Sequence, residues 1–440
     1  MYEKEEEQLK DYKNMYENIK IPLVSIDDAI LAGFQKAKLE KKRKPRRQKW
    51  VFSLVTASLI LVGFFTSIRL SPAFAGYITV IPGMEKVVEL IRYDKGKMMA
   101  IENDYYEKID VSKEKNGLKF TIDGAIADEN GLALFYTIKS KEKQTVLETE
   151  GVQLSSQDGK SLNLSGISMG SPLNSEKGEL THSDMFEFYV QSPLESKKFE
   201  LKVRVKGKNL QEDFKLKFEL KKKLQKKKTY ALNKTVTIDS QKISFLKADI
   251  YPLRVAVHVK MDPNNTKRIF SFDDLRLVDE NGETWNKIQN GVIASIISPD
   301  EYILYLQSNY FRNPKELYLV LNKIQAIDKD EVNVVVDTEK LQILKQPNGG
   351  HLSNLRIVGN NLYLSLRTKK EFNYFLFINI KDGDGKKIES NMSSVNGNGE
   401  KGITEIGVNI PNLKNQTNPI SLELSNFPSW IIGNEKIKIK

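Results

Sequence analysis

An uncharged stretch of nineteen residues, from 50 to 68, constrains this chain more than any other feature. It reads WVFSLVTASLILVGFFTSI, and as an α-helix it would be roughly 28 Å long, close to the hydrocarbon thickness of a bilayer. Its serine and threonine hydroxyls can hydrogen-bond to helix carbonyls, so they are compatible with a membrane span. We therefore predict a transmembrane helix over residues 50–68.

The basic residues around this stretch lie almost entirely on one side. Seven of them fall between positions 41 and 49, whereas only Arg69 follows the stretch closely. By the positive-inside rule, residues 1–49 are cytoplasmic, and the chain is a single-pass cell-membrane protein with an extracellular C-terminus. A buried core helix fits this basic flank poorly. A cleaved signal peptide, suggested by Ala73-Phe74-Ala75, would have a much shorter region before its apolar run.

The predicted cytoplasmic arm, residues 1–49, contains two amphipathic helical patterns separated by Pro22. So short a segment cannot bury two apolar stripes alone, so a partner groove, the membrane surface or the other helix must cover them. Asp27 and Asp28 border the second stripe, and anionic lipid would repel them, so we expect a protein partner. The candidate partner-binding residues are Leu9, Tyr12, Tyr16, Ile26, Ala29, Ile30 and Phe34.

Composition argues against several kinds of site. The chain has no cysteine, which removes disulfides, thiol nucleophiles and zinc–thiolate sites. Its three histidines, His182, His258 and His351, are too far apart in sequence to form a local metal-binding pair. The net charge of +11 is modest for 440 residues, and no basic stripe is interleaved with aromatic residues. We therefore expect no enzyme, no cofactor, no metal and no direct nucleic-acid partner.

The period of the apolar residues changes along the exterior. Met84, Val87 and Ile91 fall on one face of a short helix, whereas from residue 118 onward apolar residues recur at every second position. Runs of this kind, separated by turn sequences such as DENG, are typical of antiparallel β-sandwiches. The fold class that we predict is mainly β, with tandem immunoglobulin-like sandwiches, one transmembrane helix and a helical arm.

The strand layout recurs three times, with tight turns at QDGK, ENGE and GDGK. We expect a juxtamembrane helical linker followed by three β-sandwich units, at residues 69–117, 118–225, 226–345 and 346–440. The strands DFKLKFELKK, DEVNVVVDTEK and NEKIKIK are expected to close the first, second and third units respectively. The lysine-rich residues 221–228 are expected to form a solvated seam between the first two units. The turn around Asp382-Gly383-Asp384-Gly385 lacks the closing glutamate of a calcium loop and is expected to be a hairpin.

The run SPAFAGYITVIPGMEKVVELIRYDKG, continuing to Tyr106, resembles the start of an uncharacterised ectodomain, domain of unknown function number 4179. Proteins with this domain look like single-pass anti-sigma-factor-like proteins of Gram-positive bacteria. The sequence IDDAILAGFQKAK before the basic run is similar to theirs as well, and the later β units resemble the immunoglobulin-like domain often joined to it. The zinc-binding His and Cys motif of better-studied anti-sigma factors is absent.

The resemblance implies a membrane-anchored regulator that holds an extracytoplasmic-function sigma factor inactive until an envelope signal arrives. Its partners would be the sigma factor inside, the lipid bilayer, and an unknown envelope ligand outside. Without the zinc motif, sigma binding would rest on the two helices of the arm. The alternative is an envelope adhesion or scaffold protein whose β units bind cell-wall polymer and whose arm is passive.

Overall fold

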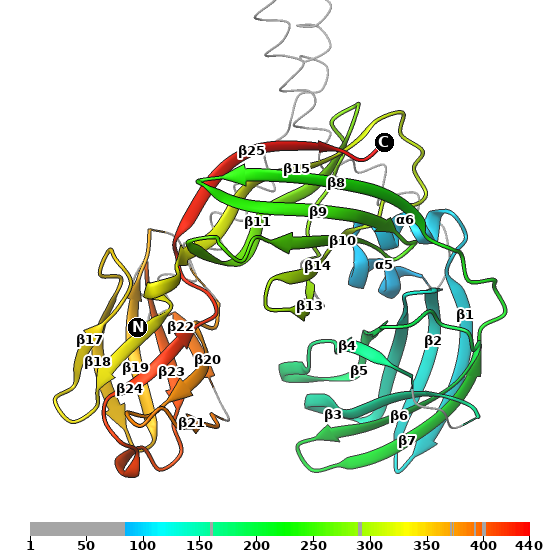
Figure 1. Ribbon diagram of the computed structural model, residues 1–440. Coiled ribbons are helices and arrows are strands. Elements are labelled where there is room, and N and C mark those ends of the chain that lie inside the picture. Colours follow the sequence, from blue (N-terminus) through cyan, green and yellow to red (C-terminus); the bar gives the residue numbers. More distant parts are fainter. Residues whose placement is uncertain are drawn as a thin grey trace, which may run out of the picture. The chain divides into compact units, whose positions relative to one another are not determined.

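The computed structural model describes residues 84–440 except 159–161, 289–292, 370–371, 373, 391–392 and 398–401. The predicted cytoplasmic arm, the predicted transmembrane helix and the first part of the predicted linker lie outside these residues. Among the residues that are described, neither helix has the length and apolar character that a membrane crossing requires. The described part is mainly β, with several antiparallel sheets, as the two-residue period predicts (Figure 1).

Two short helices come first, α5 (Glu85–Ile91) and α6 (Lys95–Glu102). Val87 and Ile91 of α5 are buried, which confirms the predicted amphipathic face. The side chain of Asp94 caps α6 by accepting a hydrogen bond from the backbone N–H of Lys97 at 3.0 Å. In α6, six consecutive residues, 96–101, are buried, so this helix is enclosed on all sides, whereas α5 packs by its apolar face.

The first sandwich is a single seven-stranded sheet that folds over its own core. Its strands are β1 (Glu107–Lys115), β2 (Leu118–Asp128), β3 (Gly131–Ser156), β4 (Leu164–Ser168), β5 (Leu173–Val190), β6 (Lys198–Gly207) and β7 (Gln211–Glu219). The long strand β3 joins the two layers, because its first half pairs with β2 and β5 and its second half pairs with β6. Stacked rings of Phe120, Tyr136 and Phe186 fill the middle of the core.

The second sandwich consists of two sheets with the strand orders β13-β14-β10-β9-β8 and β12-β11-β15-β25. Its strands are β8 (Lys228–Ile238), β9 (Gln241–Ile250), β10 (Arg254–Met261), β11 (Lys267–Asp279), β12 (Thr284–Trp285), β13 (Ala294–Ser298), β14 (Glu301–Gln307), β15 (Leu317–Asp328) and β25 (Trp430–Lys438). The orders β1-β2-β3-β5-β4 and β8-β9-β10-β14-β13 follow the same succession along the chain, so these parts of the first two sandwiches share a topology.

The third sandwich consists of two sheets with the orders β17-β16-β24-β20-β21 and β18-β19-β23-β22. A short 3-10 helix, η3 (Lys329–Glu331), lies between β15 and β16, and a second one, η4 (Leu413–Asn415), lies between β23 and β24. The strands are β16 (Asn333–Asp337), β17 (Gln342–Lys345), β18 (Leu352–Val358), β19 (Asn361–Arg367), β20 (Phe377–Lys381), β21 (Lys387–Ile388), β22 (Ser393–Gly397), β23 (Ile403–Asn409) and β24 (Ile420–Leu424).

Two strands pair across the unit boundaries that we expected from the sequence. β16, expected to close the second unit, pairs with β24 of the third sandwich and buries Val334 and Val336 in its core. β25, expected to close the third unit, pairs with β15 of the second sandwich and buries Ile431 and Ile437 there. The third sandwich is therefore inserted between two neighbouring strands of the second.

Candidate functional site

All seven predicted partner-binding residues, from Leu9 to Phe34, lie outside the described residues. The described part offers a different candidate site, where the helices α5 and α6 meet the first and second sandwiches. Five consecutive residues, Tyr93 to Lys97, contact both sandwiches, and we call them the joint segment. In sequence, this segment follows α5, the first element of the described chain.

Toward the second sandwich, the joint segment is held by hydrogen bonds and by close backbone packing. The carbonyl of Tyr93 accepts a hydrogen bond from Gln307 Nε2 at 2.8 Å. Lys95 Nζ donates to Glu283 Oε1 at 3.1 Å and to the Thr284 carbonyl at 3.0 Å. A Cβ at Gly96 would lie 2.5 Å from the backbone nitrogen of Ser308, so only glycine allows this approach.

Toward the first sandwich, the joint segment is held by a buried ion pair. The side chain of Lys97 is 2% exposed, and its Nζ lies 2.6 Å from Asp94 Oδ2 and 2.7 Å from Glu187 Oε1 of β5. Burial alone would lower the pKa of Lys97, but the two carboxylates outweigh it and raise that pKa above its ordinary value. Lys97 therefore stays charged, and its ammonium fixes α6 to the first sandwich.

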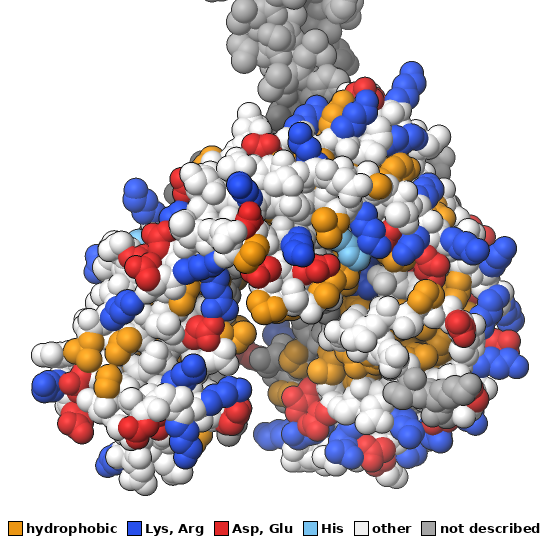
Figure 2. All heavy atoms as spheres, in the orientation of Figure 1, with side chains coloured by type: hydrophobic (Ala, Val, Ile, Leu, Met, Phe, Trp, Pro, Cys, Tyr) orange, Lys and Arg blue, Asp and Glu red, His pale blue; other side chains and the backbone are white. Residues whose placement is uncertain are grey.

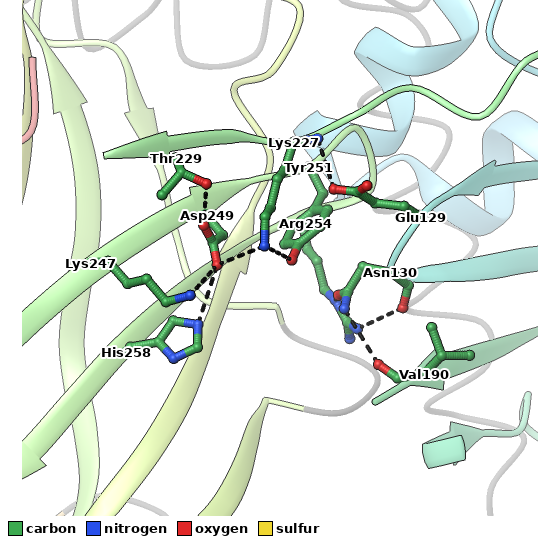
Figure 3. Close-up of polar contacts among 10 residues, drawn as sticks. All are labelled: Glu129, Asn130, Val190, Lys227, Thr229, Lys247, Asp249, Tyr251, Arg254 and His258. Carbon is green, nitrogen blue, oxygen red and sulfur yellow. Dashed lines mark hydrogen bonds and ion pairs between the residues drawn. The ribbon is translucent and has the colours of Figure 1, made fainter. Parts of the chain in front are cut away.

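Arg254, at the start of β10, links the first and second sandwiches (Figure 3). Its Nε donates to Asn130 Oδ1 at 2.7 Å and its Nη2 donates to the Asn130 carbonyl at 3.2 Å. The guanidinium carbon lies 3.8 Å from the ring centre of Tyr189 and 4.1 Å from that of Tyr305. Cation–π contacts with these two rings compensate part of the cost of burying this charge.

Asp128, the last residue of β2, makes a second link between these sandwiches. Its side chain is fully buried, and it accepts hydrogen bonds from the backbone N–H groups of Leu253 at 2.9 Å and Asn130 at 2.8 Å. Burial raises the pKa of Asp128 to about 6, although both hydrogen bonds and the charge of Arg254 oppose that rise. The contact thus contains a carboxyl group that titrates under mildly acidic conditions.

Residues 221–228, the expected seam, have mostly exposed lysine side chains but a backbone that is held in place. The Glu107 carboxylate accepts hydrogen bonds from the backbone N–H groups of Lys221 at 2.6 Å and Lys222 at 2.9 Å. The N–H of Lys227 donates to Glu129 Oε1 at 3.0 Å. The connection between the two sandwiches is therefore bonded to the first of them along its length.

The carboxylate of Asp249, on β9, is surrounded by hydrogen-bond donors and positively charged side chains (Figure 3). Thr229 Oγ1 donates to it at 2.6 Å, and Lys247 Nζ, Lys227 Nζ and His258 Nε2 lie 3.0, 3.4 and 3.4 Å from its Oδ2. Burial would raise the pKa of Asp249, but these donors together lower it. His258 is thus a partner of a carboxylate on a neighbouring strand, and no cluster able to hold a metal ion occurs in the described ranges.

The joint segment was not found as a site from the sequence, although the RYDKG run belongs to the stretch that carries the family resemblance. Gln307 and Tyr93 are 214 positions apart, and nothing local in either sequence indicates the pairing. The one local signal is a glycine between two lysines inside a short helical pattern, where glycine is otherwise unfavourable.

Two family models match parts of the chain. Residues 44–140 match a domain of unknown function, DUF4179. The match confirms the resemblance to that domain, and it includes α5, α6, the joint segment, β1, β2 and the start of β3. A second model, a family of unknown function designated DUF5643, matches residues 227–345.

No curated protein matches the chain. Among solved structures, the conserved domain protein from Bacillus anthracis is similar over 55% of this chain and 84% of its own, with 14% sequence identity and a TM-score of 0.38.

Proposed function

We propose that this protein is a single-pass, anti-sigma-factor-like regulator of the cell membrane. The observation that carries the proposal is the extent of the DUF4179 match. It begins at residue 44, within the basic run, and continues through the apolar stretch, the joint segment and the first strands. The predicted span and the joint segment, which contacts both sandwiches, therefore lie within the same family match. A protein that couples an exterior domain to an interior one would require such a connection.

In this proposal the immunoglobulin-like sandwiches face the envelope. The joint segment transmits a change in their relative position to the span. Lys97 fixes α6 to the first sandwich, while Lys95 and Gly96 fix it to the second. A ligand that moved one sandwich relative to the other would have to break contacts of the joint segment. The joint segment follows the predicted span in sequence, after residues 69–83 and α5, so in this proposal the break would be transmitted to the span along that part of the chain.

Inside the cell, the amphipathic arm would hold a sigma factor through its two apolar stripes. Ile30 and Phe34 fall on one stripe of the predicted second helix, one turn apart. The basic run would then fix the arm at the inner surface of the membrane.

The first experiment replaces Ile30 and Phe34 with alanine in the full-length protein. If both are interface hot spots, binding to the sigma factor should weaken by about 2 to 4 kcal/mol, a thirty-fold loss or more. Transcription of the regulated operon should rise, while membrane insertion stays normal. Pull-down of the sigma factor and a transcriptional reporter measure the two effects.

The matched control replaces Gln35, which lies away from the apolar stripe on the predicted helix, with alanine and should change neither readout. If the apolar pair and this polar control have equally small effects, the arm is passive and the protein acts as an envelope scaffold.

A further inference from the structure

A series of buried contacts connects Asp128, at the interface between the first two sandwiches, with α6. Asp128 Oδ1 accepts a hydrogen bond from the N–H of Asn130 at 2.8 Å, and Asn130 in turn accepts two hydrogen bonds from Arg254. The guanidinium carbon of Arg254 lies 3.8 Å from the ring centre of Tyr189, on β5. Arg254, from the second sandwich, therefore connects the end of β2 with β5 of the first.

The contacts continue from β5 into the joint segment. The hydroxyl of Tyr189 donates to Glu187 Oε2 at 3.0 Å, and Glu187 Oε1 lies 2.7 Å from Lys97 Nζ. The carboxylate of Glu187 thus lies between the sandwich interface and α6. We call the whole series the buried network, and its members are Asp128, Asn130, Arg254, Tyr189, Glu187 and Lys97.

The buried network is sheltered from water. Charged side chains of both signs are spread over the surface in Figure 2, whereas the network members other than Asn130 are at most 6% exposed. Asp128, Glu187 and Tyr189 line one small cavity together with Arg254 of the second sandwich. If the sandwiches separate here, water reaches Glu187. Its ion pair with Lys97 then loses most of its strength, because water screens the attraction.

Asp128 makes this separation depend on pH. Its carboxyl is fully buried and accepts a hydrogen bond from the N–H of Leu253, which belongs to the second sandwich, so separation exposes it to water. Burial raises the pKa of Asp128 to about 6, and hydration would return that pKa toward its ordinary value. The closed interface is therefore favoured while the proton is bound, and this preference is lost as the pH rises through about 6.

Other titratable groups also face Asp128. Besides Arg254, they are Glu129 in the following turn, Glu187 in the shared cavity, and the hydroxyls of Tyr105, Tyr251 and Tyr310. Burial raises the pKa of all three tyrosines, so they are uncharged from pH 5 to pH 7. Glu129 and Glu187 are still present in Asp128→Asn, so that variant separates their titration from that of Asp128.

We propose that the buried network couples protonation of Asp128 to the anchoring of α6. Loss of the proton opens the interface between the first two sandwiches and frees Lys97 from Glu187, while Lys95 and Gly96 keep the joint segment on the second sandwich. The inference rests on the proposed function only in placing the network outside the cell, where pH becomes a signal. The coupling needs no sigma factor, so the two proposals fail separately.

Hydrogen exchange of the full-length protein in detergent, at pH 5 and pH 7, tests this coupling. Protection is calculated against the exchange rate of an unprotected amide at each pH. With a pKa of about 6 closed and 3.8 open, the open fraction rises about tenfold between these conditions. We expect protection of α6 and of Leu253 to fall together by that factor. In Asp128→Asn neither should respond, and a response that persists there would overturn the proposal.

A matched pair of variants tests the route to α6. Glu187→Gln removes the carboxylate that holds Lys97, and Glu283→Gln removes the one that holds Lys95 of the same helix. Both should lower the protection of α6 at each pH. Only Glu187→Gln should abolish the tenfold response of α6 while Leu253 keeps its own, with thermal unfolding confirming that both variants fold.

Two outcomes of this comparison count against the coupling. If α6 responds equally in both variants, Glu187 holds the helix without transmitting the change. If the response at Leu253 also disappears in Glu187→Gln, then Glu187 and not Asp128 is the group that releases the proton. Either result would overturn the proposal.

Discussion

Asp128 makes the contact between the first two sandwiches sensitive to pH. Its pKa is about 6 in the folded protein, against an ordinary value of 3.8. A carboxyl group with a raised pKa holds its proton more tightly when folded. Its stabilising effect is therefore complete below about pH 4 and is lost as the pH rises through about 6. The difference between the two values corresponds to roughly 3 kcal/mol at most.

The test compares Asp128→Asn with the parent protein over residues 76–440 by urea unfolding between pH 4 and pH 7. The asparagine cannot titrate, so the difference in unfolding free energy between the two proteins should change across this range. Because other carboxyl groups titrate equally in both proteins, the difference isolates Asp128. Two parallel stability curves would contradict the assignment.

Lys97 is a residue whose loss should be costly. Replacing it with methionine leaves Glu187 and Asp94 at the buried end of α6 without their cation. Removing one partner of a buried ion pair destabilises a protein by about 3 to 5 kcal/mol. We expect the free energy of unfolding of residues 76–440, measured by thermal unfolding, to fall by this amount. Lys108→Met, at a side chain that is 77% exposed, is the control and should change stability little.

At the scale of the element, removing β25 should destabilise the second sandwich while leaving the third sandwich folded. Deleting residues 430–440 removes Ile431 and Ile437 from the core of the second sandwich and leaves β15 paired with β11 alone. Burying one isoleucine contributes about 1.5 to 3 kcal/mol, so the second sandwich should be strongly destabilised. Hydrogen exchange should show lost protection in β8–β15 and retained protection in β16–β24.

A control for this deletion is Ile432→Ser, which changes an exposed residue of the same strand and should leave protection unchanged. If the deletion instead unfolds the third sandwich first, the pairing of β25 with β15 is not what stabilises the second sandwich.

At the scale of the whole molecule, periodicity predicted element types better than partners. Helix α5, Glu85–Ile91, and the antiparallel β character followed from spacing alone, because burial on one face imposes a period of 3.6 or of 2. The partners of β16 and β25 did not follow, since an alternating apolar strand fits the open edge of either sandwich equally well. The joint segment was missed for a related reason: Glu187 and Gln307, which hold it, lie on strands far along the chain.

The insertion of the third sandwich has a consequence for the order in which the protein matures. Leu321 of β15 pairs with Glu435 of β25, and the ribosome must make the whole third sandwich between them. The first sandwich, and then the third, can close as soon as they are synthesised. The second must wait, with the hydrogen-bonding edge of β15 uncovered, until β25 appears. A nascent chain of this protein therefore carries a half-finished sheet while residues 329–429 are made, and that interval is when it most needs protection from aggregation.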